Sequence, residues 1–103
     1  MPVLPRDVKE AVDLLRTHFA RQWSIDELAA ICGVARRTLE KHFRRFTGRT
    51  PRQLRREIRL DRARLELLQA QPDASVTDIA VRCGFNHLGR FAAAYKERYG
   101  EPP

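Results

Sequence analysis

The chain has 103 residues, of which 43% are hydrophobic and 32% charged, and its formal net charge is +7. This length suits one compact domain, and the apolar fraction excludes a globally disordered chain. No run of about 18 apolar residues occurs, which excludes a membrane-spanning helix, and the start MPVLPRDVKE lacks the apolar core of a signal peptide. We therefore expect a cytoplasmic protein with no membrane partner.

The positive charge is confined to the middle of the chain. Residues 36–64 hold twelve Lys and Arg against three Asp and Glu, whereas residues 1–35 and 65–103 each hold four against five. Eleven of the twelve are arginines, whose flat guanidinium matches phosphates and guanine edges. Such a concentration of charge indicates contact with a polyanion.

Two helices are predicted before this basic segment. Apolar spacing predicts the first from Asp7 to about Arg21, with an Asp7–Glu10 capping box. A Ser24–Glu27 capping box opens a second, short helix that ends at a Cys-Gly pair.

The segment CGVARRTLEKHFRRFTG, residues 32–48, predicts a third helix at about 36–46. Leu39, Phe43 and Phe46 share one face of it, and cations fill most of the rest. Ala35 stands where a capping side chain is usual, and Gly48 ends the helix.

A long helix is predicted next, from about Pro51 to Gln69. Thr50 and Gln53 form its capping box, with proline at the first helical position. We expect an apolar stripe and a basic stripe along it, made respectively of Leu54, Ile58, Leu65, Leu68 and of Arg55, Arg59, Arg62.

An internal repeat predicts the architecture. SIDELAAICGV at 24–34 matches SVTDIAVRCGF at 75–85 with an offset of 51, and further on the offset becomes 52. A short helix, a glycine turn and a longer helix form a helix-turn-helix. We therefore expect an all-α fold of about seven helices or fewer, with two helix-turn-helix subdomains at 1–50 and 71–103 joined by a bridging helix at 51–70.

Three motifs resemble the DNA-binding domain of the AraC/XylS family of bacterial transcription regulators. They are IDELAAICGVARRTLEKHFRRFTGRTP, RLDRARLELL and VTDIAVRCGFNHLGRFAAAYKERYGEPP, and they cover nearly the whole chain. The resemblance implies sequence-specific binding of double-stranded DNA in transcription regulation, with activator as the expected class. It also implies recognition helices at about 36–46 and 87–98 that enter adjacent segments of the major groove.

The residues and the resemblance together name the candidate contacts. By match to the family's motif, Arg37, Glu40 and Lys41 occupy base-reading positions and Arg44 a phosphate position. The full set expected to read bases is Arg36, Arg37, Glu40, Lys41, Asn86, His87 and Arg90, and the set expected on phosphates is Arg44, Arg45, Arg49, Arg52, Arg56 and Lys96. On the second recognition helix Leu88, Gly89, Ala92 and Ala93 complete the matching face.

Two of these assignments have a purely structural alternative. Glu40 can accept from the amino group of cytosine, or it can pair with Arg36 or Arg44 at i±4 spacing. The arginines of the bridging helix can contact phosphates, or they can form a solvated face paired with Glu57, Asp61 and Glu66.

Other classes of function have less support in the sequence. No nucleophile–base set, phosphate-binding glycine loop or metal-ligand spacing is present, so we expect no enzyme, no metal and no cofactor. Cys32 and Cys83 are interpreted as buried small side chains. Sequence-blind nucleic-acid binding and a protein-interaction module remain the alternative functions.

Family members usually carry a separate domain that senses an effector or dimerises. We expect such a domain outside this chain, and RNA polymerase as a further partner of an activator. The operator, the regulated genes and the effector do not follow from these residues.

Overall fold

The computed structural model describes residues 4–103, and within them it contains only α-helices as regular elements. The expected all-α class is therefore confirmed, although the first three residues of the expected first subdomain lie outside the described part. The helices are α1 (Arg6–Thr17), α2 (Ile25–Cys32), α3 (Arg36–Thr47), α4 (Pro51–Gln69), α5 (Val76–Arg82) and α6 (Leu88–Tyr99).

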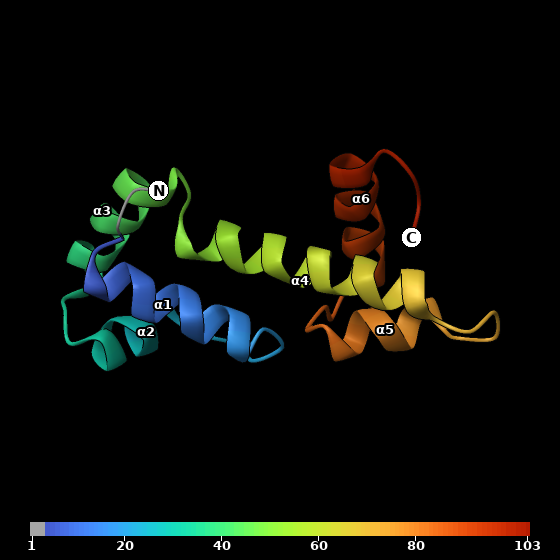
Figure 1. Ribbon diagram of the computed structural model, residues 1–103, viewed down its shortest axis with the longest axis horizontal. Coiled ribbons are helices and arrows are strands. Elements are labelled where there is room, and N and C mark those ends of the chain that lie inside the picture. The colour runs from blue at the N-terminus through green and yellow to red at the C-terminus, as the bar shows by residue number, and fades with distance from the viewer. Residues whose placement is uncertain (1–3) are drawn as a thin grey trace.

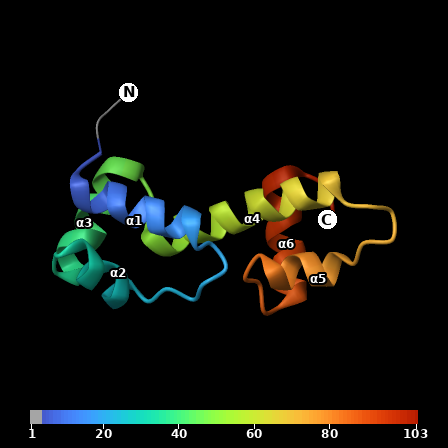
Figure 2. The same ribbon diagram turned by 60° about the horizontal axis from the view of Figure 1, so that its bottom comes forward.

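The helices form two groups at the ends of α4. Figure 1 shows α1, α2 and α3 around its N-terminal end and α5 and α6 at its C-terminal end, and the turned view in Figure 2 shows the same division. The molecule measures 45 × 25 × 21 Å, with α4 along its length. In Figure 1 both α3 and α6 run from the lower to the upper part of the view, at opposite ends of α4.

Both predicted capping boxes after α1 are present. The hydroxyl of Ser24 accepts from the Glu27 amide at 3.0 Å, and the Glu27 carboxylate accepts from the Ser24 amide at 3.2 Å. Thr50 and Gln53 make the equivalent pair at 3.1 and 3.0 Å. Each box satisfies amide groups that a helix start otherwise leaves unpaired, so the sequence places the starts of α2 and α4 correctly.

The predicted Asp7–Glu10 capping box is wrong. The residue at the N-cap of α1 is Pro5, and the helix ends at Thr17 instead of continuing to about Arg21. Asp7 lies inside the first turn and is only 8% exposed, and its carboxylate lies 2.7 Å from Nδ1 of His42 on α3. The carboxylate therefore joins two helices instead of closing one.

Two hydrophobic cores hold the fold, one in each group of helices. The first gathers apolar side chains of α1, α2 and α3, and the second those of α4, α5 and α6. The first consists of Val8, Ala11, Leu15, Trp23, Leu28, Ala29, Leu39 and Phe43, and the second of Leu60, Ala63, Ile79, Ala80, Cys83, Phe91, Ala94 and Tyr95.

The stripes predicted along α4 are partly wrong, because the two cores pack on different sides of this helix. Leu54 and Ile58 pack against the first core as expected, but Leu65 and Leu68 are 45% and 70% exposed. At 100° per residue, the second core meets a side of α4 nearly opposite to the first. A single continuous stripe cannot serve both cores, and Arg59 of the predicted basic stripe is buried as well.

The two turns of the repeat have the same backbone bonding. The amide of Val34 donates to the carbonyl of Ala29 at 3.1 Å, and that of Phe85 donates to Ala80 at 3.0 Å, with the offset of 51. After this bond α3 is capped at once by Ala35, whereas one more residue precedes the cap of α6. The extra residue accounts for the change of offset to 52.

Candidate nucleic-acid interface

Helix α3 is apolar on its buried side and cationic on its exposed side. Leu39 and Phe43 are fully buried in the first core, which fixes how the helix is rotated. Arg37, Lys41 and Arg44 are consequently exposed, and none of them forms an ion pair with another residue of the described chain. Phe46, expected on the apolar face, is 40% exposed and packs under the guanidinium of Arg45 at 5.5 Å.

The structure pairs Arg36 with Glu40. Nε of Arg36 lies 3.0 Å from the Glu40 carboxylate, and Nη1 lies 3.6 Å from Asp26 on α2. The hydrogen bond to Glu40, together with the charge of Asp26, raises the pKa of Arg36. The pairing alternative for Glu40 is thus present in the structure, while Arg37 and Lys41 beside it form no ion pair or side-chain hydrogen bond with residues 4–103.

A cleft of about 940 Å³ lies between α3 and the start of α4. Its floor is apolar and includes Leu15, Trp23 and Leu28 of the first core. Its rim is mainly cationic, with side chains from both helices, and Glu40 is its one carboxylate among the described residues; the cations are Arg36, Arg37, Lys41, Arg44, Arg45, Arg52 and Arg55. The fold therefore brings together arginines that lie on separate helices in the sequence, and it does so on the side where α3 is exposed.

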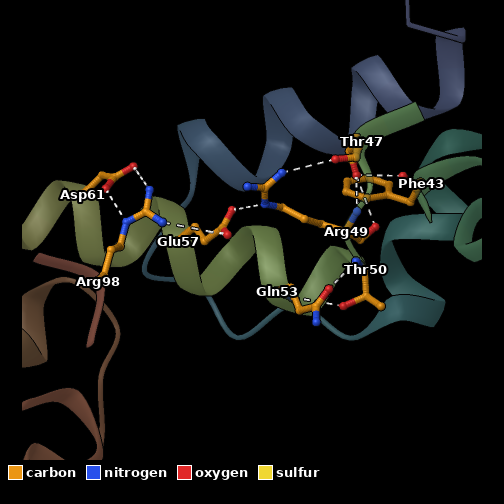
Figure 3. Close-up of polar contacts among 8 residues, drawn as sticks. All are labelled: Phe43, Thr47, Arg49, Thr50, Gln53, Glu57, Asp61 and Arg98. Carbon is orange, nitrogen blue, oxygen red and sulfur yellow. Dashed lines mark hydrogen bonds and ion pairs between the residues drawn. The ribbon is translucent and has the colours of Figure 1, made fainter. Parts of the chain in front are cut away.

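The expected phosphate contacts are not equally available. Arg52 and Arg56 at the start of α4 are exposed and form no ion pair with a described residue. Arg49 is held by Glu57, with 2.5 Å between Nε and Oε2, and also donates to the carbonyl of Thr47 (Figure 3). The hydrogen bond to Glu57 raises the pKa of Arg49. Arg49 must leave Glu57 before it can bind a phosphate, whereas Arg52 and Arg56 need no such rearrangement.

The second recognition helix has a different surface. His87 caps α6, and its Nδ1 accepts from the amide of Arg90 at 3.0 Å. Because Nδ1 is used in this way, the neutral ring carries its proton on Nε2 and offers one donor outward. Asn86, Arg90 and Lys96 are exposed, so all the residues expected to touch DNA from this unit are accessible.

The sequence does not predict the contacts that two arginines of α4 make. Arg55 donates to the carbonyl of Trp23 at 2.8 Å, and Arg59 donates to two carbonyls of the loop between α1 and α2. Helical periodicity relates a residue to its neighbours on one helix, so it contains no signal for carbonyls supplied by a distant loop. Arg59 is therefore buried and structural, whereas Arg55, although its guanidinium is bonded to a loop carbonyl, is half-buried and still lines the cleft.

Residues 4–103 show neither of two other classes of site. No group of three or more His, Cys, Asp or Glu lies in an arrangement that could hold a metal ion. No helix of that part is long and apolar enough to cross a membrane.

Comparison with known proteins shows several close similarities. A family model described as a helix-turn-helix domain matches residues 28–103. The probable thc operon regulatory protein of Rhodococcus erythropolis is 41% identical over 103 residues, which are 99% of this chain and 31% of that relative. This chain spans less than a third of the length of the first curated relatives that it matches.

Solved structures share the whole fold. A probable AraC family transcriptional regulator from Rhodopseudomonas palustris CGA009 is 30% identical with a TM-score of 0.88, over 96% of this chain and 92% of that chain. The DNA-binding domain of AdpA, a global transcriptional factor crystallised in complex with a target DNA, is 29% identical with a TM-score of 0.83, over 96% and 87% of the two chains.

Proposed function

The chain belongs to the AraC/XylS family of bacterial transcription regulators, and on that premise we propose that it reads duplex DNA with two recognition helices. Helices α3 and α6 enter adjacent segments of the major groove, and α4 sets the distance between them. The two subdomains correspond to residues 1–50 and 71–103, with the bridging helix at 51–70. The AdpA neighbour, which was crystallised with a target DNA, supports DNA as the partner.

The observation that carries the proposal is the exposed surface of α3 and the start of α4. Arg37, Lys41 and Arg44 are exposed on α3 without an ion-pair partner in the described chain, and Arg52 lies across the same cleft. Arginine and lysine donate to guanine O6 and N7 or to phosphates. On such a surface the unpaired donors of the helix can bind base edges in the major groove, while the cations beside it bind the phosphates on either side of the groove.

Base reading is proposed for Arg36, Arg37, Glu40 and Lys41 in the first unit, and for Asn86, His87 and Arg90 in the second. Glu40 has a double role in this proposal: it orients Arg36 in the free protein and accepts from a cytosine amino group in the complex. Phosphate contacts are proposed for Arg44, Arg45, Arg49, Arg52, Arg56 and Lys96.

Selection of bound duplexes from a random pool tests the proposal. We expect an enriched motif with two half-sites about one helical turn apart, and a random duplex should compete poorly against it. The logarithm of the binding constant should fall with the logarithm of salt concentration, with a slope of about −0.9 for each phosphate neutralised. Equal competition by random duplexes would show sequence-blind binding instead and would overturn the proposal.

The remaining proposals concern the whole regulator. We propose that effector sensing and dimerisation belong to a separate domain, because the curated relatives are more than three times as long as this chain.

We propose that this chain acts through binding alone, as befits a family of transcription regulators, and has no catalytic activity. Contact with RNA polymerase is proposed for an activator, and variants that lose activation but keep DNA affinity would identify the surface.

A further inference from the structure

The two helix-turn-helix units meet at the middle of α4. Ile58 packs against the first core, and Leu60, two residues later, lies in the second. Phe19 follows α1 in the chain and yet packs against the second core. The loop after α1 therefore reaches across to the other unit, and the stretch of α4 around residues 57–61 is the junction between them.

A buried arginine links three segments at this junction. Arg59 is 6% exposed, and its guanidinium donates to the carbonyls of Phe19 at 2.6 Å and Arg21 at 2.8 Å. Gly84, in the turn before α6, lies directly against the same guanidinium. A Cβ at Gly84 would stand 2.8 Å from Nε of Arg59 and 3.1 Å from Cα of Ala20. No larger residue fits there without displacing the guanidinium of Arg59 or the backbone of the loop or the turn.

A direct bond reinforces this first link. Nε2 of Gln22 donates to the carbonyl of Gly84 at 3.2 Å, so the loop of the first unit is bonded to the turn of the second. Arg59 has no carboxylate partner among the described residues, and its burial, with the nearby charge of Arg55, lowers its pKa to about 10. A buried charge without a counter-ion is unfavourable in general, so the contacts of Arg59 point to a role in position and not in stability.

A second link runs along α4 in Figure 3. Glu57 lies between Arg49, in the loop after α3, and Arg98, in the last turn of α6, at 2.5 and 3.8 Å. Asp61, one turn further along α4, holds the same guanidinium of Arg98 through two hydrogen bonds of 2.9 and 3.1 Å. The chain of charges therefore connects the end of one recognition helix to the end of the other.

The two links lie on opposite sides of α4. Arg59 is two residues from Glu57 and two from Asp61, so it points roughly 200° away from both. A rotation of the second unit about α4 moves Gly84 relative to Arg59 and Arg98 relative to Glu57, so it disturbs both links. Packing on the shared helix allows small rotations, and these paired links oppose them.

We propose that Arg59 and Glu57 are positioning residues that hold α6 at one angle to α3 and thereby set the half-site spacing that the protein accepts. This inference rests on the proposed function, because spacing has meaning only if both helices read DNA. Each base pair inserted between half-sites turns one site by roughly 35° about the duplex axis, so a rigid junction rejects it and a loose junction tolerates it.

The first experiment needs no DNA. Residual dipolar couplings of the isotope-labelled protein are measured separately for α1–α3 and for α5–α6. We expect one alignment tensor to fit both groups in the unchanged protein, and two different tensors in Arg59→Met and in Glu57→Gln. Arg59→Lys, which keeps the charge and one donor group, should restore part of the agreement. Two tensors in the unchanged protein, or one tensor in both variants, would overturn the proposal whether or not the protein binds DNA.

The second experiment measures spacing on DNA. The probes are duplexes enriched by this domain from a random pool, their versions with one or two base pairs added or removed between half-sites, and the isolated first half-site. For Arg59→Met we expect affinity for the best spacing to fall roughly tenfold, because the second contact loses effective concentration. Affinity for the isolated half-site should stay within about twofold, since α3 keeps its own core. An equal loss on both probes would indicate simple destabilisation and contradict a positioning role.

The repeat supplies a matched control. Gly33 stands at the same place as Gly84 in the first unit and also has a positive φ, of 71° against 98°, but nothing lies within 4 Å of a Cβ built on it. Gly84→Ala and Gly33→Ala both place a side chain on backbone with a positive φ, and only Gly84→Ala presses on Arg59. We expect the spacing preference to broaden in Gly84→Ala alone. The same broadening in both variants would overturn the role of the junction. If Gly84→Ala does not fold, the spacing preference of Glu57→Gln is measured in its place, and an unchanged preference would overturn that role.

Discussion

The residues that correspond to Arg37 and Lys41 in the second unit are Gly89 and Ala93, at the offset of 52. The first recognition helix therefore carries cations where the second carries small side chains. We predict that Arg37→Ala weakens binding to the enriched duplex by about 1–3 kcal/mol, and that Arg90→Ala costs less at the same salt concentration. Fluorescence anisotropy with one labelled duplex compares them.

Arg36→Ala is the internal control for that comparison. Its guanidinium is already engaged by Glu40 and Asp26, so its removal should cost less than that of Arg37. A larger loss in Arg90→Ala than in Arg37→Ala would reverse the ranking of the two units.

Cys83 lies fully buried, and its thiol donates to the carboxylate of Glu66 at 3.0 Å. Burial, followed by this hydrogen bond, raises the pKa of Cys83 to about 12, and burial also raises the pKa of Cys32. Because the thiolate is the reactive form, we predict that neither cysteine reacts rapidly with a thiol reagent at pH 8 in the folded protein. Cys83 is buried as expected, but Cys32 is only partly buried. Both should react after denaturation, and a rapid stoichiometric reaction of folded protein would contradict the assignment of inert thiols.

The contrast between α3 and Arg59 shows what the sequence could reveal at this scale. The exposure of Arg37 and Lys41 follows from Leu39 and Phe43, because apolar residues at helical spacing decide which side of a helix is buried. Arg59 belongs to the same kind of pattern in the sequence and is nevertheless buried, because its partners are carbonyls of a loop some forty positions earlier. Contacts of that kind depend on the assembled fold and have no local signature.

At the scale of single helices, the start of α3 lacks a side-chain cap. Ala35 has the extended backbone of an N-cap but makes no side-chain hydrogen bond there, unlike Ser24 and Thr50. We predict that Ala35→Ser raises the free energy of unfolding by about 1 kcal/mol, measured by urea denaturation. Ser24→Ala is the matched control and should lower it by a similar amount, about 1 kcal/mol. No gain in Ala35→Ser would mean that DNA-free α3 is already capped by another group.

The contact between α4 and α6 should depend on pH. Burial alone would raise the pKa of Asp61, but hydrogen bonds from Arg98 and Tyr99 outweigh it and leave the pKa below its ordinary value of 3.8. A carboxylate with a lowered folded-state pKa stabilises the fold above its unfolded-state pKa, and this contribution is lost as the pH falls through the folded-state value. Asp61→Asn should therefore reduce stability at pH 7, and the difference from the unchanged protein should shrink below about pH 4.

Urea denaturation at pH 7 and at pH 3 measures that difference. Glu101, which lies 3.6 Å from Arg64 at an exposed site, provides a comparison, because Glu101→Gln removes a carboxylate outside the contact between α4 and Arg98. A constant difference between Asp61→Asn and the unchanged protein at both pH values would exclude the assigned role of the carboxylate.

For the whole molecule, the length of α4 is the dimension that DNA must match. The sequence could predict this helix from Pro51 to Gln69, because the Thr50–Gln53 box and the following turn mark its ends. It could not predict how the two cores rotate about the helix, since that angle depends on side-chain links such as Arg59 and Glu57. The sequence therefore predicts the length of α4, but it does not predict the relative orientation of the recognition helices.

That distance implies a bend in the bound DNA. The 19 residues of α4 span roughly 28 Å, whereas one turn of B-DNA rises about 34 Å. If both recognition helices engage the same face of the duplex, a rigid bridge shorter than the turn draws the two groove segments together. We predict that the DNA bends toward the protein, at a cost that the contacts of the second unit offset. A gel phasing assay with the enriched duplex placed at varied distances from an intrinsic bend measures the direction, and Arg90→Ala, which weakens the second contact, should reduce the bend. Straight DNA in the complex would contradict the simultaneous engagement of both helices by a rigid bridge.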